Sequence, residues 1–164
     1  MPTATVSHGD FDRAGNVTLH NEPITLGDQM FIYYSADGVS MRHIGAATLP
    51  RDRFVGLASG ALAKTDVNPG GEGYVLTKPL AASGKELEVN VEMLGGGALR
   101  VEVHNDDFSP IEGFATDDCV PVTADGCRVP IQWRNGHRWA ELAGGRVMLV
   151  FRFTRSVLYA YRLA

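Results

Sequence analysis

The stretch with the greatest capacity for chemistry is GFATDDCVPVTADGCRVPIQW, residues 113–133, which holds both cysteines of the chain, Cys119 and Cys127. A disulfide between them requires a turn that brings their Cα atoms within about 4.4–6.8 Å, and an exported protein would favour it whereas the cytosol would not. Seven residues separate the two thiols, which is not a zinc-binding spacing. We interpret the stretch as a strand–turn–strand element with two small buried cysteines and leave the disulfide open. Its short acidic residues are expected to hydrogen-bond their own turns: Asp117, Asp118 and Asp125.

No other group of residues has the spacing of a catalytic, metal or cofactor site. The five histidines are far apart and form no His-x-His or His-x-x-x-His pair, so we predict no metal ligands and no cofactor. The chain has neither a Gly-x-Ser-x-Gly nucleophile elbow nor a complete phosphate-binding loop. We therefore predict no catalytic residue.

The composition is that of an ordinary globular protein and excludes some partners. The chain has 164 residues, of which 45% are hydrophobic and 21% charged, enough for one domain or two small ones. A net charge of −4 and scattered basic residues argue against nucleic acid. No apolar run approaches the roughly 20 residues of a membrane span. The first residues lack the features of a signal peptide, so we expect an extracellular protein if an export signal has been removed and a cytoplasmic one otherwise.

Strands of alternating polarity must position whatever site the chain has. Residues 86–93 (ELEVNVEM) and 98–103 (ALRVEV) alternate apolar with polar side chains, and the glycines of LGGGA between them predict a hairpin. In that register Glu88 or Glu92 would lie near Arg100. Residues 146–153 and 156–163 predict a second hairpin that closes the chain.

The remaining signals also favour β-structure. Further strands are predicted at 29–34, 43–49, 73–77 and 129–133, and a short helical turn only at RWAELAG, residues 138–144. Glycines and prolines punctuate the chain throughout, as in many-stranded β proteins. We predict an all-β fold, an antiparallel β-sandwich of the jelly-roll or concanavalin A-like kind.

A series of elements resembles one known group of proteins. In chain order the elements are LGDQMFIYYSADG, HIGAATLPRDRFVGL, GEGYVLTKPL, GKELEVNVEMLGGGALRVEV, IEGFATDDC, VPIQW and LAGGRVMLVFRFTRSVLYAYRL. Together they resemble the C-terminal region of glycoside hydrolases of the fructosidase and arabinanase type, in which a five-bladed β-propeller is followed by a β-sandwich. The resemblance covers about residues 24–164.

This resemblance implies a domain organisation. Residues 24–164 would form the β-sandwich domain, in which 24–57 resemble the remnant of the last propeller blade, 58–72 form a linker loop and 73–164 form the sandwich core. Residues 1–23 would be an N-terminal segment whose order the sequence leaves open.

The resemblance also implies a function. Catalytic carboxylates of such hydrolases lie on earlier blades, which this chain lacks, so we predict that it is not an enzyme. We expect a non-catalytic, lectin-like carbohydrate-binding module whose partner is a polysaccharide or oligosaccharide. The alternatives are a structural or oligomerisation domain without a small-molecule ligand, or a fragment of a glycoside hydrolase.

Sugar binding needs aromatic rings that stack on the sugar and polar groups that hold its hydroxyls. Two tryptophans flank the turn RNGHR, residues 134–138. Strand alternation would point Trp133 into the core, whereas Trp139 could be core or platform. Phe108 is a weaker aromatic candidate. The predicted carbohydrate-binding residues are Trp139, Trp133, Arg134, Asn135, His137 and Tyr74.

Residues 29–34, QMFIYY, are apolar on both faces. Such a strand normally lies between two covering layers, and its sheet would leave an edge open to another chain. We therefore expect a homodimer.

Overall fold

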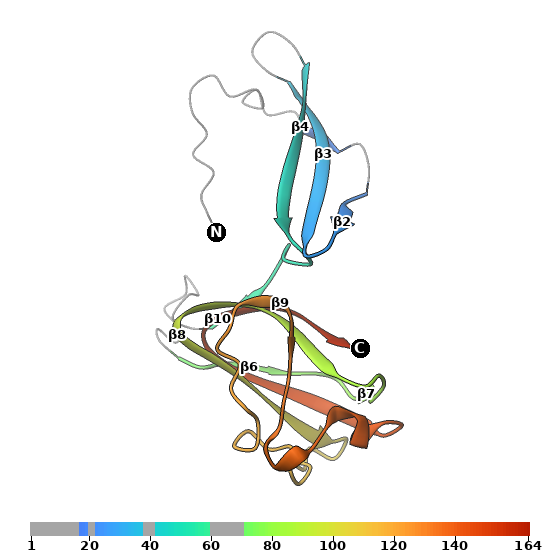
Figure 1. Ribbon diagram of the computed structural model, residues 1–164, viewed down its shortest axis with the longest axis vertical. Coiled ribbons are helices and arrows are strands. Elements are labelled where there is room, and N and C mark those ends of the chain that lie inside the picture. Colours follow the sequence, from blue (N-terminus) through green and yellow to red (C-terminus); the bar gives the residue numbers. More distant parts are fainter. Residues whose placement is uncertain (1–16, 20–21, 38–41, 60–70) are drawn as a thin grey trace. The chain divides into compact units, whose positions relative to one another are not determined.

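The computed structural model describes residues 17–19, 22–37, 42–59 and 71–164, and the chain divides into two compact units, 1–51 and 52–164 (Figure 1). Both units are built from antiparallel strands, which confirms the all-β prediction. The strands are β1 Val17–Leu19, β2 Ile24–Leu26, β3 Gln29–Asp37, β4 Arg42–Pro50, β5 Leu57–Ala58, β6 Gly73–Leu76, β7 Leu80–Ala81, β8 Leu87–Asn105, β9 Gly126–Pro130 and β10 Arg146–Leu163. Two 3-10 turns, η1 Arg134–Gly136 and η2 Trp139–Leu142, complete the elements, and η2 confirms the predicted helical turn. No described helix is long and apolar enough to cross a membrane.

The first unit contains one sheet centred on β3 (Figure 1). β4 pairs with β3 along its whole length, from Gln29 opposite Pro50 to Asp37 opposite Arg42. β1 and β2 pair with the two ends of β3, so they lie in line along its other edge. The β2–β3 hairpin turns at Gly27, whose φ of 61° suits the first position of a two-residue turn. The strands predicted at 29–34 and 43–49 are therefore confirmed. Most of the predicted N-terminal segment 1–23 lies outside the described residues.

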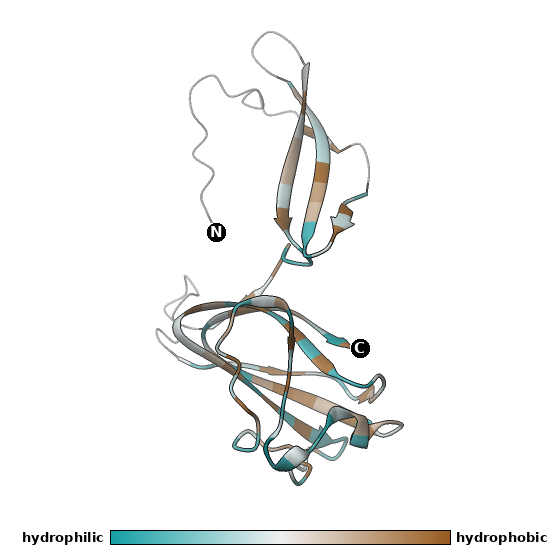
Figure 2. Cartoon of the chain, in the orientation of Figure 1, coloured by the Kyte–Doolittle hydropathy of each residue, from teal (hydrophilic) through white to brown (hydrophobic). Residues whose placement is uncertain are grey.

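Apolar residues follow one another along β3 (Figure 2), so both faces of this sheet carry apolar side chains, as predicted for residues 29–34. Because paired residues share a face, Met30, Ile32 and Tyr34 lie on the face of Val17 and Leu19. Phe31 and Tyr33 lie on the opposite face, with Ile24 and Leu26. Several large apolar side chains of the unit remain exposed: Val17, Leu19, Ile24, Leu26, Tyr33 and Ile44. Within its described residues, the first unit is a single layer with apolar groups on either side.

The second unit is organised by one long strand pair. β8 and β10 run antiparallel from Val147 opposite Asn105 to Leu163 opposite Leu87. The two predicted hairpins are therefore wrong, because each predicted pair of strands is one continuous strand. The predicted placement of Arg100 is wrong for the same reason. Instead Glu88 forms a salt bridge with Arg162, at 2.6 Å.

The glycines between the two halves of β8 bend the strand rather than reverse it. Met93 pairs with Ser156 and Ala98 pairs with Thr154, so four residues of β8, 94–97, stand against the single residue Arg155 of β10. Such an irregular bulge bends the strand that carries it. A Cβ on Gly97 would lie 2.5 Å from the Arg155 carbonyl oxygen, and Gly96 has a φ of 75°. The LGGGA signal thus marks a corner at which two backbones approach closely.

Short strands complete this sheet on both edges. β7, β6 and β5 pair in turn with one edge of β10, and β9 pairs with the first half of β8. Both halves of the bent pair contribute to one core, which includes Leu87, Val91, Val101, Phe151 and Leu158. β9 ends at Pro130, earlier than the predicted 129–133 strand, but Trp133 still bridges to Cys119.

Arg53 fixes residues 52–59 to this second unit. Its guanidinium donates hydrogen bonds to Asn90 Oδ1, to the Val91 carbonyl and to Asp125 Oδ1, at 2.8–2.9 Å. It also lies 5.2 Å from the centre of the Tyr159 ring. The unit boundary consequently falls after residue 51, whereas the sequence placed residues 24–57 together. Most of the predicted linker, residues 60–70, lies outside the described residues.

Candidate ligand-binding pocket

The segment after β9 forms two consecutive 3-10 turns. Asn135 and Gly136 have φ values of 61° and 79°, which an Asn-Gly pair adopts at low cost. The second turn begins with a reciprocal pair of bonds, in which the Arg138 N–H donates to Glu141 Oε1 at 2.9 Å and the Glu141 N–H donates to the Arg138 carbonyl at 3.0 Å. The predicted site residues 133–139 are therefore held on a defined turn.

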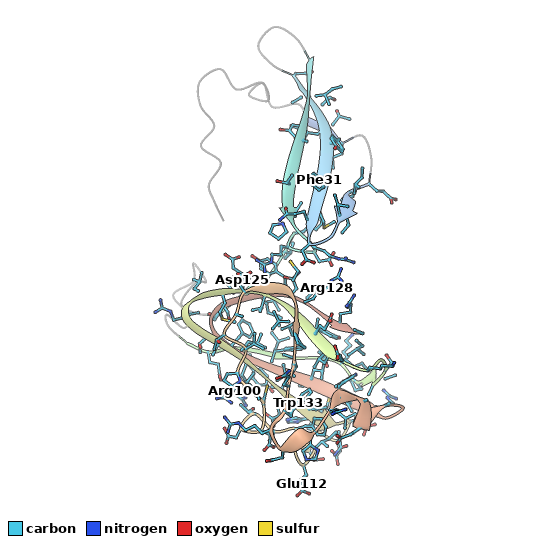
Figure 3. The ribbon with its side chains drawn as sticks, viewed as in Figure 1. Phe31, Arg100, Glu112, Asp125, Arg128 and Trp133 are labelled. Carbon is cyan, nitrogen blue, oxygen red and sulfur yellow. The ribbon has the colours of Figure 1, made fainter. Side chains whose placement is uncertain are left out.

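Both tryptophans belong to the core, as strand alternation predicted for Trp133 (Figure 3) and as one of the two readings allowed for Trp139, so neither is the open stacking platform that a sugar site would need. Trp133 is 5% exposed and Trp139 is 2% exposed. The Trp133 ring packs edge-on against Phe114, with centroids 5.0 Å apart, and its Nε1–H donates to the Val101 carbonyl. The Trp139 Nε1–H donates to the Ser83 carbonyl at 2.8 Å. Each indole is fixed by packing and by a hydrogen bond, so neither presents an open ring face to a sugar.

A pocket of about 700 Å³ nevertheless opens over this turn. Edges of Trp133 and Trp139 contribute to its wall together with Ile131 and Pro130. Polar side chains line the rest: Lys85, Glu86, Gln132, His137 and Arg138. Within the described residues, Lys85, Gln132 and Arg138 donate no side-chain hydrogen bond, so their donors face solvent or a ligand.

His137 is the best-fixed polar group of the pocket. Its Nδ1 lies 3.0 Å from Glu141 Oε2, and its ring centroid lies 5.4 Å from that of Phe114. Gly113 passes so close that a Cβ there would lie 2.6 Å from His137 Nε2. The hydrogen bond from His137, followed by that from the Arg138 N–H, lowers the pKa of the Glu141 carboxyl. The histidine is thus held in one orientation by a carboxylate and a ring.

The other predicted site residues do not join the pocket. Arg134 and Asn135 are exposed on the first 3-10 turn and do not line it. Tyr74 lies on β6, where the guanidinium of Arg152 sits 5.2 Å from its ring centre. Phe108, the weaker aromatic candidate, is exposed in the turn after β8, with a φ of 69°.

Sequence reasoning missed Lys85, Glu86 and Gln132. The first two precede β8, and they reach the pocket because the Ile131 N–H bonds to the Leu87 carbonyl at 2.8 Å. Residues more than 40 positions apart are thereby brought together. No local pattern in the sequence signals that contact.

The stretch between the cysteines is architectural. Cys119 and Cys127 are both thiols. The Cys119 Sγ accepts a hydrogen bond from the Val101 N–H at 3.2 Å, and burial raises the pKa of this thiol. Asp118 accepts from the Ala115 N–H at 3.2 Å, as expected for a turn aspartate, whereas Asp125 binds Arg53. Cys119 is fully buried, as predicted, and Cys127 is half-buried.

A second polar cluster lies on the outer face of β8. Glu102 Oε1 lies 2.7 Å from His104 Nε2, and Thr116 Oγ1–H donates to Glu102 Oε2 at 2.7 Å. Burial acts to raise the pKa of Glu102, but the bonds from Thr116 and His104 outweigh it and lower that pKa. Thr116 and His104 thus both bond to Glu102, which is the centre of this cluster. Among the described residues, no three His, Cys, Asp or Glu side chains gather as a metal site would require.

Comparison of the chain with protein-family models, with curated proteins and with solved structures gave no match. The function must therefore be argued from the geometry of the two units.

Proposed function

We propose that this chain is a non-catalytic carbohydrate-binding module that binds an oligosaccharide or a segment of a polysaccharide. One observation carries the proposal: the pocket of about 700 Å³ beside the 134–138 turn, which combines an apolar wall with the polar side chains of Lys85, Gln132 and Arg138. Ligand pockets commonly measure about 300–1,000 Å³ and join apolar walls to a few placed polar groups. The proposal includes a relationship to the accessory sandwich of propeller glycoside hydrolases.

Burial of the tryptophans changes how a sugar would be held. Hydrogen bonds from Gln132 and Arg138 would fix hydroxyl groups at the rim, and His137 would offer a preoriented ring nitrogen. The indole edges would contact the apolar C–H groups of the sugar. Binding of this kind depends on placed donors, so single rim substitutions should weaken it strongly.

The finer fold is part of the same proposal. The bend at residues 94–97 and 155 divides the β8–β10 sheet into two halves, and side chains from both halves belong to one core. We take these halves to be the two layers of a β-sandwich. The pocket would then lie beside the turn that follows β9.

Affinity electrophoresis against a panel of plant and microbial polysaccharides tests the proposal. We expect at least one glycan to retard the chain and Arg138→Ala to abolish most of that retardation. Arg134→Ala is the matched control, because Arg134 is a neighbouring exposed arginine outside the pocket. Absence of retardation by every glycan, or equal retardation of both variants and the parent, would overturn the proposed site.

A second candidate function rests on the first unit. Its sheet exposes large apolar side chains on both faces, with Leu26 72% and Ile44 81% exposed on one face and Leu19 64% exposed on the other. Monomeric soluble proteins rarely leave such surface uncovered. A structural or oligomerisation role for this unit is compatible with a sugar site on the other.

A further inference from the structure

β4 is a nine-residue strand with an open outer edge. Its inner edge pairs with β3 in one unbroken register, and no described strand pairs with its outer edge. Between Ile44 and Leu49 the strand reads I-G-A-A-T-L, without a charge, a proline or a bulge. Natural edge strands are usually protected by such devices. This edge is therefore a ready template for another strand.

The register identifies which backbone groups face outward. The Arg51 N–H donates to the Asp28 carbonyl, so the 28–51 pair is a hydrogen-bonded pair. Hydrogen-bonded and non-hydrogen-bonded pairs alternate along an antiparallel ladder. The N–H and C=O groups of Ile44, Ala46 and Thr48 consequently point away from β3. Pro50 falls in the same outward series, where the proline costs no hydrogen bond to β3.

We propose that two copies of the chain pair through β4, antiparallel, about a two-fold axis at Ala46. In this arrangement Ala46 faces Ala46 of the second copy, and Ile44 faces Thr48. Each of these pairs can exchange both backbone hydrogen bonds, because all the groups involved point outward. The two sheets then become one continuous sheet across the axis.

A second copy fits this edge because the edge is self-complementary. A two-fold contact needs the same residues to oppose one another, and the centre of β4 offers the small side chains of Gly45, Ala46 and Ala47. No like charges face each other between residues 44 and 48. The inference concerns the first unit alone and does not depend on the sugar pocket of the second.

Sedimentation equilibrium of the full chain and two variants tests the contact. We expect the parent to approach twice the 17.7 kDa chain mass and Ala46→Pro to remain at 17.7 kDa. The Ala46 N–H points outward, so proline there removes the intermolecular donor and spares the bond to β3. Leu26→Lys is the control, because Leu26 lies on the opposite edge strand and is 72% exposed. We expect this control to dimerise like the parent.

The control also separates edge pairing from stacking of the apolar faces. Loss of the dimer in Leu26→Lys with its retention in Ala46→Pro would overturn edge pairing in favour of face packing. A constant mass of 17.7 kDa for the parent at high concentration would overturn the dimer altogether.

Cross-linking tests the register without relying on proline. In a Cys127→Ser background, Ala46→Cys would place two thiols on Cα atoms about 5.5 Å apart, within disulfide range. Thr48→Cys would place them about 14 Å apart along the strands, beyond that range. We expect mild oxidation to yield covalent dimer for Ala46→Cys and little for Thr48→Cys. Equal yields, or a higher yield for Thr48→Cys, would overturn the proposed register.

Discussion

Replacement of Trp139 by alanine should destabilise the second unit severely. The indole is 2% exposed and belongs to the same core cluster as Trp133, Leu87 and Val101. Deletion of a buried tryptophan side chain to alanine typically costs about 3–5 kcal/mol of unfolding free energy. Loss of the bond to the Ser83 carbonyl adds little, because Ser83 is exposed and water can replace the donor. The loss is a large part of the roughly 5–15 kcal/mol available to a domain.

Urea unfolding followed by tryptophan fluorescence measures this loss. The chain has two tryptophans, so Trp133 remains as the reporter within the same core. Trp139→Phe keeps most of the ring volume and should lose only about 1–2 kcal/mol. Tyr74→Ala, at an exposed ring, should lose less than about 1 kcal/mol. A loss below about 1 kcal/mol in Trp139→Ala, accompanied by loss of glycan retardation, would refute the burial argument and restore the ring as a platform.

Three further outcomes follow from the second unit. Arg53→Ala should lower the unfolding free energy by about 2–4 kcal/mol, because it removes several charge-assisted bonds. In the same urea assay, Arg53→Lys should recover part of this free energy. A loss below about 1 kcal/mol in the alanine variant would contradict a stabilising role for these bonds. Burial, and then the bond to Glu92, raises the pKa of Tyr159 from 10.0 to about 12. Stability should therefore fall as the pH rises from about 10 to 12, and less so in Tyr159→Phe; equal slopes would exclude this cause. With an aromatic disulfide reagent, Cys127 should react in the folded chain and Cys119 only after unfolding. If the chain is unfolded without a reductant and neither thiol reacts, the two cysteines form a disulfide.

The existence of the strands was predictable from the local sequence. The segments 29–34 and 43–49 are short apolar runs next to glycine or proline, and the structure places β3 and β4 there. The two apolar faces of 29–34 also follow from the sequence. Successive residues of a strand point to opposite faces, and consecutive residues of this segment are apolar.

The pairing of the long strands was not predictable from the same signal. A glycine run between two alternating segments favours a tight hairpin when each segment is considered alone. In the folded chain, each half of β8 pairs with one half of β10, and a glycine is needed where Gly97 passes the Arg155 carbonyl. A tight turn and a close approach of two backbones both require glycine. Only the long-range pairing of β8 with β10 shows which of the two the glycines form.

The sequence predicted a sugar site around the 134–138 turn, and the structure changes which side chains there are open to a ligand. Two tryptophans beside a polar turn are equally typical of a core corner and of a sugar platform. Burial decides between them, and it depends on Phe114 and Ser83, which lie far from the turn in sequence. The pocket beside the turn is lined by Lys85, Gln132 and Arg138 rather than by open aromatic rings.

The two proposed surfaces bear on each other through valency. A shallow pocket with a few rim donors would bind a short oligosaccharide weakly, and a dimer through β4 would carry two such pockets. A polysaccharide repeats its sugar units, so one polymer can engage both pockets, and the second contact forms at the effective concentration set by the first. An oligosaccharide that fills one pocket gains nothing from the dimer. If both proposals hold, Ala46→Pro should weaken retardation by the polymer and leave the affinity for its short oligosaccharide unchanged, whereas Arg138→Ala should weaken both. If Ala46→Pro weakens binding of the polymer and of the oligosaccharide equally, the substitution acts on the pocket itself, and the explanation by two linked pockets is wrong.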